Sequence, residues 1–242
     1  MSLVKIYSGL TTIQSASAVV FSTFVAIHGA QVAVATIGGP DMSNRWLLLG
    51  RPFYQDQHLE GLLVSGAAVV HVLAGVAKAG IRGYWGQKNN NNTTTTLLPY
   101  HHIVGYVLVP VVWLHYDLVR TLPVRYFGDS AMLDFGHIAW GLQNWPIFTY
   151  TLHGTLIGTA AYHIVSGASL AYQRTFKRKR SENASPSSSS SSSSVYRPHK
   201  KMAAAATVGL VLLSGLFIIG RQTKKIPLRF EYEAIYKMLL PN

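Results

Sequence analysis

Four histidines lie inside long apolar stretches of this 242-residue chain: His28, His71, His115 and His163. An ionisable side chain in the hydrocarbon of a membrane is costly, so a histidine there either has a function or hydrogen-bonds a neighbouring helix. Two imidazoles that face each other at one depth are suited to hold the iron of a b-type haem from its two sides. The residue types therefore predict bis-histidine haem ligation, with the packing of neutral imidazoles between helices as the alternative.

The segments around these histidines repeat. GAAVVHVLAG, residues 66–75, aligns with GTAAYHIVSG, residues 158–167, at an offset of 92 residues, which places His71 on His163. A weaker match aligns AIHGAQVAVA with WLHYDLVRTL at an offset of 87 residues and places His28 on His115. This internal repeat predicts a duplicated pair of helices with one histidine in each helix.

The spacing also predicts which histidines share a depth. His71 and His163 each precede an arginine by 11 residues, which is about 16 Å along a helix. His28 and His115 each lie about 14 to 15 residues into their helices, so they share a second depth. We therefore predict His71 with His163, and His28 with His115, as cofactor-binding residues and haem-iron ligands. Whether haem is bound is left open.

Glycines accompany the stronger repeat: Gly66, Gly75, Gly158 and Gly167. Glycines beside the histidines would let a macrocycle lie against the backbone. Alternatively, small residues bring membrane helices into close contact without any cofactor. The other six histidines are weaker ligand candidates, because the sequence places them at span ends (His101, His102, His153) or in loops (His58, His137, His199).

The composition places these histidines in a membrane. Charged residues make up 12% of the chain, about half the usual share, and residues 6–40, 61–77, 135–173 and 202–220 carry none. Neutral apolar runs of about 17 to 25 residues are membrane-span candidates. We predict an all-α polytopic membrane helix bundle with five transmembrane helices and a duplicated helix pair. The five spans are residues 13–37, 59–80, 101–122, 148–172 and 202–220.

These spans divide the chain into seven segments. They are a short N-terminus (1–12), a first helix pair (13–80), a low-complexity loop (81–100), a second helix pair (101–172), a basic Ser-rich loop (173–201), a fifth helix (202–220) and a C-terminal tail (221–242). The two remaining connections, residues 38–58 and 123–147, are expected to be loops on the opposite side of the membrane. The runs Asn89 to Thr96 and Ser187 to Ser194 are expected to be disordered.

The cations predict the orientation. The N-terminus and the loops after the second and fourth spans hold twelve Lys and Arg, and the opposite side holds nine. The positive-inside bias therefore places the N-terminus in the cytosol and the C-terminus across the membrane. The net charge of +12 does not indicate nucleic-acid binding, because these cations flank membrane spans and meet anionic lipid. No cleaved targeting signal is evident, so an endoplasmic reticulum or a mitochondrial outer membrane is expected.

Four segments carry a resemblance to a known family: LGRPFYQD (Leu49 to Asp56), HIVGYVLVPVVWLHYDLVR (His102 to Arg120), GHIAWGLQNWP (Gly136 to Pro146) and TLHGTLIGTAAYHIVSG (Thr151 to Gly167). Over about residues 13–220 the chain resembles the fungal mitochondrial adapter family. Its members are five-span outer-membrane proteins found as suppressors of defects in the tether between endoplasmic reticulum and mitochondria. The motifs VHVLAG and YHIVSG are also similar to the histidine helices of the cytochrome b membrane anchors of succinate dehydrogenase and fumarate reductase.

The resemblance implies a non-enzymatic mitochondrial outer-membrane adapter in lipid homeostasis. It would recruit a bridge-like lipid-transfer protein to contacts between the vacuole and mitochondria. In that family the role is associated with a proline-bearing segment ahead of the first span, whereas this sequence has about a dozen residues there and no Pro-x-Pro motif. The alternative function is transmembrane electron transfer by a bis-histidine b-type haem. Against it, the chain has no cysteine for iron–sulfur clusters and no flavin or dinucleotide fingerprint.

Overall fold

The computed structural model describes residues 2–86, 98–177 and 198–239, and none of them lies in a β-strand. The predicted all-α class is therefore confirmed for this part of the chain. The runs Asn89 to Thr96 and Ser187 to Ser194 lie outside the described residues. The helices are α1 (Leu3–Ala33), α2 (Ala35–Tyr54), α3 (Gln57–Leu59), the π-helical turn η1 (Glu60–Gly66), α4 (Ala67–Gly86), α5 (His101–Tyr116), the π-helical turn η2 (Asp117–Thr121), α6 (Leu122–Phe127), α7 (Phe135–Asn144), α8 (Pro146–Tyr172), the π-helical turn η3 (Gln173–Lys177), α10 (Pro198–Gln222) and α11 (Arg229–Leu239).

In the part of the chain that the structure describes, four helical segments are long and apolar enough to cross a membrane: Leu3–Ala33, Glu60–Tyr84, His101–Phe127 and Pro198–Gln222. They correspond to the predicted spans at 13–37, 59–80, 101–122 and 202–220. The predicted span at 148–172 is helical too, as α8, but its 27 residues mix Thr, Ser, His and Tyr with apolar side chains. It therefore falls short of the mean hydropathy of the other four. The fifth span and the duplicated helix pair stay predictions.

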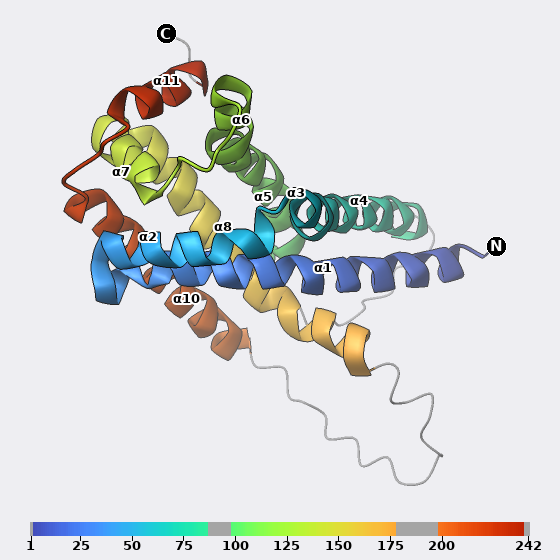
Figure 1. Cartoon of the computed structure of the whole chain (residues 1–242). Helices are drawn as coiled ribbons and strands as arrows, with labels where there is room; N and C mark the ends of the chain where they lie inside the picture. The colour runs from blue at the N-terminus through green and yellow to red at the C-terminus, as the bar shows by residue number, and fades with distance from the viewer. Residues whose placement is uncertain (1, 87–97, 178–197, 240–242) are drawn as a thin grey trace. The chain divides into compact units, whose positions relative to one another are not determined.

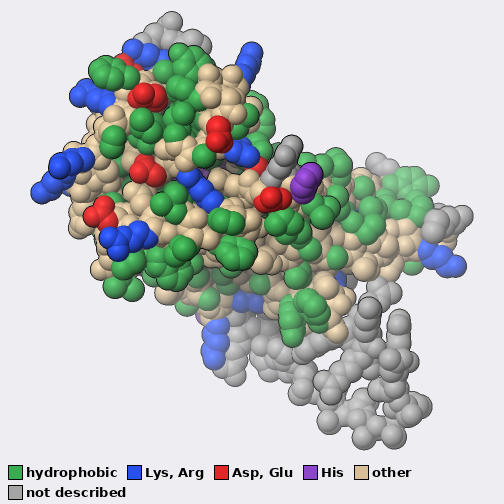
Figure 2. Space-filling view, in the orientation of Figure 1, with side chains coloured by type: hydrophobic (Ala, Val, Ile, Leu, Met, Phe, Trp, Pro, Cys, Tyr) green, Lys and Arg blue, Asp and Glu red, His purple; other side chains and the backbone are tan. Residues whose placement is uncertain are grey.

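One face of α4 shows why such a helix suits a membrane. Val69, Leu73 and Val76 are 55%, 62% and 51% exposed, and their spacing places them on one side of the helix. On the face of the molecule in Figure 2, hydrophobic side chains likewise cover much of α4 and the adjoining part of α1. A stripe of this kind is costly in water and favourable in lipid, so α4 has the surface expected of a transmembrane helix.

The chain divides into two compact units. The first unit comprises residues 1–26, 53–101 and 164–203, and the second unit comprises residues 27–52, 102–163 and 204–242. Several long helices contribute to both units, because the division falls within α1, α8 and α10.

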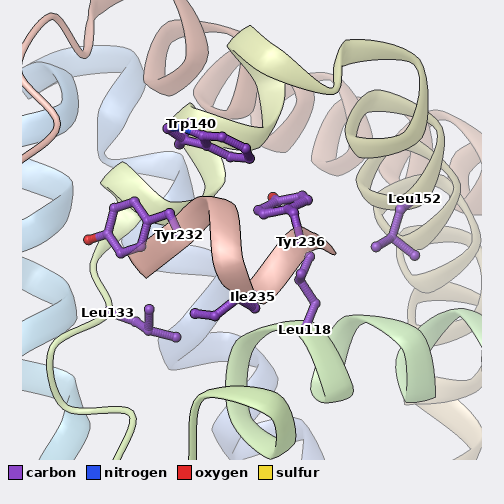
Figure 3. Packing of buried hydrophobic residues seen from close by; sticks show 7 residues of the cluster. All are labelled: Leu118, Leu133, Trp140, Leu152, Tyr232, Ile235 and Tyr236. Atoms are coloured by element: carbon purple, nitrogen blue, oxygen red, sulfur yellow. The ribbon is translucent and has the colours of Figure 1, made fainter. Parts of the chain in front are cut away.

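The main core of the second unit lies beneath α11. In Figure 3, Tyr232, Ile235 and Tyr236 project from this helix into a cluster with Leu118, Leu133, Trp140 and Leu152. Helix α11 contacts α6, η2 and α7, and Figure 1 shows it beside α6 and α7. The three α11 side chains are at most 1% exposed, so the C-terminal tail is an integral part of this core.

A carboxylate links three helices at this core. Asp134 caps the N-terminus of α7, where its Oδ1 accepts from the Gly136 amide at 2.8 Å. The same oxygen accepts from the Tyr232 hydroxyl of α11 at 3.0 Å, and Oδ2 accepts from the Asn44 amide of α2 at 3.4 Å. Burial and the neighbouring negative charge of Asp134 raise the pKa of Tyr232, so its hydroxyl stays a hydrogen-bond donor.

The connections expected to be loops contain helices. Helix α2 occupies most of residues 38–58, with a kink at Gly39 (φ 69°, ψ −171°) immediately before Pro40. A positive φ is readily adopted by glycine, and proline favours the first turn of a helix, so this pair sets a new helix direction. Helix α7 occupies the second connection, and α11 occupies the tail. These helices have 20 or fewer residues. They are not among the long apolar helices, so the pattern that predicts membrane spans does not predict them.

Candidate functional site: a histidine cluster in the second unit

His28 lies near the C-terminal end of α1 and is held by a glutamine one turn further along. Its Nδ1 lies 3.3 Å from Gln31 Oε1. The Gln31 amide in turn donates to the Trp46 carbonyl of α2 at 3.2 Å. Gly50 makes room for this contact, because a Cβ there would overlap the Gln31 amide nitrogen. Gln31 is 1% exposed, so its hydrogen bond to α2 is shielded from solvent.

His115 lies in the last turn of α5 and contacts a histidine of α8. Its Nδ1 lies 3.3 Å from His153 Nε2, and the two ring centroids are 5.2 Å apart with the planes nearly perpendicular. His153 Nδ1 lies 2.9 Å from the Thr149 carbonyl. Because a carbonyl only accepts, His153 carries its proton on Nδ1 when neutral, and its Nε2 accepts from His115.

The two histidine groups meet at His28 and His115, whose ring centroids are 6.2 Å apart with the planes inclined at 52°. The predicted proximity of these two residues is therefore present in the structure. Together the groups form one partly buried polar series in the second unit, which runs through Trp46 O, Gln31, His28, His115, His153 and Thr149 O. Neutral imidazoles with hydrogen-bond partners lower the cost of placing polar groups in apolar surroundings.

The residues fit a two-ligand haem site better than a multi-ligand metal site. Among the described residues, no group of three or more His, Cys, Asp or Glu is arranged to hold a metal ion. His28 and His115 come from different helices and present their rings to each other. The Nδ1 of each is engaged by Gln31 or His153, which is the second-shell arrangement that orients histidine ligands.

His71 and His163 are placed differently. His71 lies in the first unit, where its Nδ1 is 3.1 Å from the Gln14 carbonyl of α1. His163 lies in the second unit against α5, where a Cβ at Gly105 would lie 2.9 Å from its Cε1. Since the two histidines lie in different units, their pairing stays a prediction.

The glycines of the repeat have roles other than a common cofactor cradle. The space beside Gly75 is occupied by the Gln14 side chain, and the space beside Gly167 by the His101 ring, at 2.9 and 3.2 Å from an added Cβ. A Cβ at Gly66 would meet the Gly61 carbonyl of its own π-helical turn at 2.6 Å, whereas nothing lies within 4 Å of one at Gly158. Gly75 and Gly167 therefore allow close packing of helices, which is the alternative to a cofactor cradle that the sequence left open.

His153 is a member of the cluster that sequence reasoning ranked low. Its position near the start of the predicted span 148–172 suggested a span end, where water or headgroups could satisfy it. In the structure it is 5% exposed. The sequence carries no signal for this, because the Thr149 carbonyl that holds the ring is a backbone group, and every position inside a helix has a carbonyl four residues earlier.

His137 on α7 was also ranked low, and it is 1% exposed between Tyr232 and Tyr236 of α11, at centroid distances of 5.0 and 5.1 Å. Burial lowers the pKa of His137 from 6.5 to about 3, with the nearby His153 as a lesser cause. The folded chain therefore keeps this ring neutral where the unfolded chain would protonate it. Stability is lost as the pH falls from 6.5 toward about 3.

These features define the class of protein, a polytopic helical membrane protein with histidines packed between its helices. Residues 110–224 match the family model described as MDM10-complementing protein 1, transmembrane domain. The match covers α8, α10 and the C-terminal part of α5, includes His115, His153 and His163, and supports the resemblance to the mitochondrial adapter family. No curated protein matches the chain, and no solved structure does.

Proposed function

We propose that this chain is a mitochondrial outer-membrane adapter in lipid homeostasis that recruits a bridge-like lipid-transfer protein to contacts between the vacuole and mitochondria. The observation that carries the proposal is the family match over residues 110–224, whose description links the family to MDM10. The four apolar helices support a multi-pass membrane location. The proposed orientation places the N-terminus in the cytosol and the C-terminus in the intermembrane space, as the distribution of Lys and Arg favours.

Recruitment requires a cytosolic surface, and this orientation offers residues 2–12, 82–99 and 174–201. The last segment is the preferred one, because the basic block at residues 177–180 adjoins a Ser-rich sequence that can order on a partner. A simpler explanation of the basic block is that it fixes the orientation of the chain in the membrane and contacts anionic lipid. The two roles are separable, because a change confined to residues 181–196 leaves every cation of the block in place.

We expect replacement of residues 181–196 by a Gly/Ser linker to abolish most of the mitochondrial signal of a fluorescent lipid-transfer protein, measured by imaging. The same linker exchange at residues 89–96, in the second of these segments, is the matched control and should leave that signal unchanged. The adapter itself should stay at mitochondria in both cases, because the basic block at residues 177–180 is retained. Full recruitment in both variants, with normal localisation of each, would contradict the proposed adapter role for these segments.

A b-type haem redox protein is the second candidate, favoured by the 6.2 Å spacing of His28 and His115. Haem bound there would supply one-electron transfer within the membrane. The chain's own contribution is to bring two imidazoles from α1 and α5 close together, with their planes inclined, and to orient them through Gln31 and His153.

The purified protein should then show a low-spin b-type absorption spectrum that His115→Leu converts to high-spin or abolishes. His58→Leu is the control, because His58 is exposed at α3. If the wild type binds no haem under conditions that load a known b cytochrome, the redox function is excluded. In that case His115→Leu should cost only about 0.6 to 1.7 kcal/mol, the range for an interhelical hydrogen bond in a membrane.

A further inference from the structure

Helix α2 carries an exposed apolar stripe, although it is not one of the long apolar helices. Met42, Trp46 and Leu49 are 41%, 46% and 72% exposed. At about 100° of rotation per residue, these three positions lie within roughly 60° of one another and form one stripe along the helix. A row of large apolar side chains is unfavourable in water. The stripe therefore requires apolar surroundings.

The side of α2 that packs on the protein is a different one. Ser43, Leu47 and Gly50 are buried, and the Trp46 carbonyl accepts from the Gln31 amide of α1 at 3.2 Å. Figure 1 shows α2 beside the C-terminal part of α1. The contact with α1 is thus made by the buried side and the backbone of α2, and the apolar stripe faces away from it.

The polar side chains of α2 lie on further sides of the helix. Asp41 and Arg45 are exposed and lie about 90° around the helix from the centre of the stripe. Asn44 donates to Asp134 Oδ2 at 3.4 Å, and Arg51 donates to a backbone carbonyl of the connection before α7. The exposed surface of α2 is thus divided into an apolar side and a charged side. This division is typical of a helix at the boundary between membrane and water.

The chain connections place α2 at such a boundary. Only Val34 separates it from α1, and only residues 55–59 separate its end from the apolar segment Glu60–Tyr84. A chain that leaves a membrane after one span re-enters it from the same side, so the segment between two spans lies at that surface. Trp46 fits this level, because tryptophan is enriched where hydrocarbon meets the lipid headgroups.

We propose that α2 is an interfacial membrane helix, with Met42, Trp46 and Leu49 among the lipid acyl chains and with Asp41 and Arg45 at the headgroups. The connection between the first two spans is then part of the lipid-binding surface of the protein and not a loop in water. This placement requires only that the chain is a membrane protein, so it is independent of partner recruitment and of haem. A protein partner and a second copy of this chain are the other occupants that an apolar stripe fits, and the experiment separates both from lipid.

The first measurement is the reactivity of single thiols, which is specific because the chain contains no cysteine. Leu49→Cys and Arg45→Cys place a thiol on the apolar side and on the charged side of α2, about one turn apart. Both variants replace exposed residues. In lipid nanodiscs, where both membrane faces are open to the reagent, Leu49→Cys should react with a charged maleimide at least about tenfold more slowly than Arg45→Cys. The reason is that apolar surroundings exclude the reagent and disfavour the reactive thiolate. Met42→Cys repeats the test at a second position of the stripe and should also react slowly.

The second measurement identifies what covers the stripe. An environment-sensitive fluorophore is attached to each thiol in detergent, and the labelled protein is placed in nanodiscs of phosphatidylcholine with or without bromine on the acyl chains. Brominated lipid should quench the fluorophore at Leu49→Cys at least about twofold more strongly than at Arg45→Cys, because only the apolar side contacts acyl chains. Equally fast reaction of the two thiols would place the stripe in water and overturn the proposal. Slow reaction of Leu49→Cys without quenching by brominated lipid would show that protein covers the stripe, which would overturn its assignment to lipid.

Discussion

Replacement of Tyr236 by alanine is expected to lower the free energy of unfolding by about 3 to 5 kcal/mol, the range for loss of a large buried aromatic side chain. The Tyr236 ring is fully buried. Its centroid lies 5.1 Å from that of His137, 5.2 Å from that of Trp140 and 6.4 Å from that of Phe148. Truncation leaves a cavity among rigid rings that cannot close readily, and α11 loses one of its fully buried side chains in this cluster (Figure 3).

The same helix provides the control. Phe230 is 82% exposed, so Phe230→Ala should change stability by no more than about 0.5 kcal/mol. Denaturant titration of both variants in the same detergent measures the difference. Equal losses in the two variants, or no loss in either, would show that α11 is not packed on α6 and α7 as in the structure.

Substitution of Gly215 by alanine should lower the free energy of unfolding by about 1 to 3 kcal/mol, because the added methyl group overpacks a helix contact. Gly215 of α10 faces the end of α1 in the second unit. A Cβ there would overlap the Val32 carbonyl oxygen and lie 3.1 Å from its carbon. Backbone atoms cannot rotate away as a flexible side chain can, so the two helices must separate locally.

Gly209→Ala, six residues earlier in α10, is the matched control. A Cβ at that position would lie 3.9 Å from the Ala161 Cβ, which is an ordinary contact distance. Alanine is also a better helix former than glycine, so this variant should be neutral or slightly stabilised. Thermal unfolding of the two variants separates steric overlap from a general effect of glycine removal. A loss for Gly209→Ala as large as that for Gly215→Ala would contradict this account.

The sequence predicted the membrane helices and one histidine contact, because both depend on local properties. A neutral run long enough to cross hydrocarbon must be helical whatever its neighbours are, and four helices have the required length and hydropathy. The depth of a residue follows from its distance to the span end. This is why His28 and His115 were expected at one level and have ring centroids 6.2 Å apart.

Only the tertiary structure decided which other groups join them. His153 completes the polar series because α8 presents it to His115 on a neighbouring helix, and a count of residues from a span end carries no information about facing direction. The helices α2, α7 and α11 have too few apolar residues for a span. Their packing is set by long-range contacts such as Asp134 with Asn44 and Tyr232, which lie 90 and 98 residues away. The sequence by itself therefore determined which segments are long and apolar enough to cross a membrane and which histidines lie at a similar level of their helices, whereas the partners across helices depend on rotations and packing that no local pattern encodes.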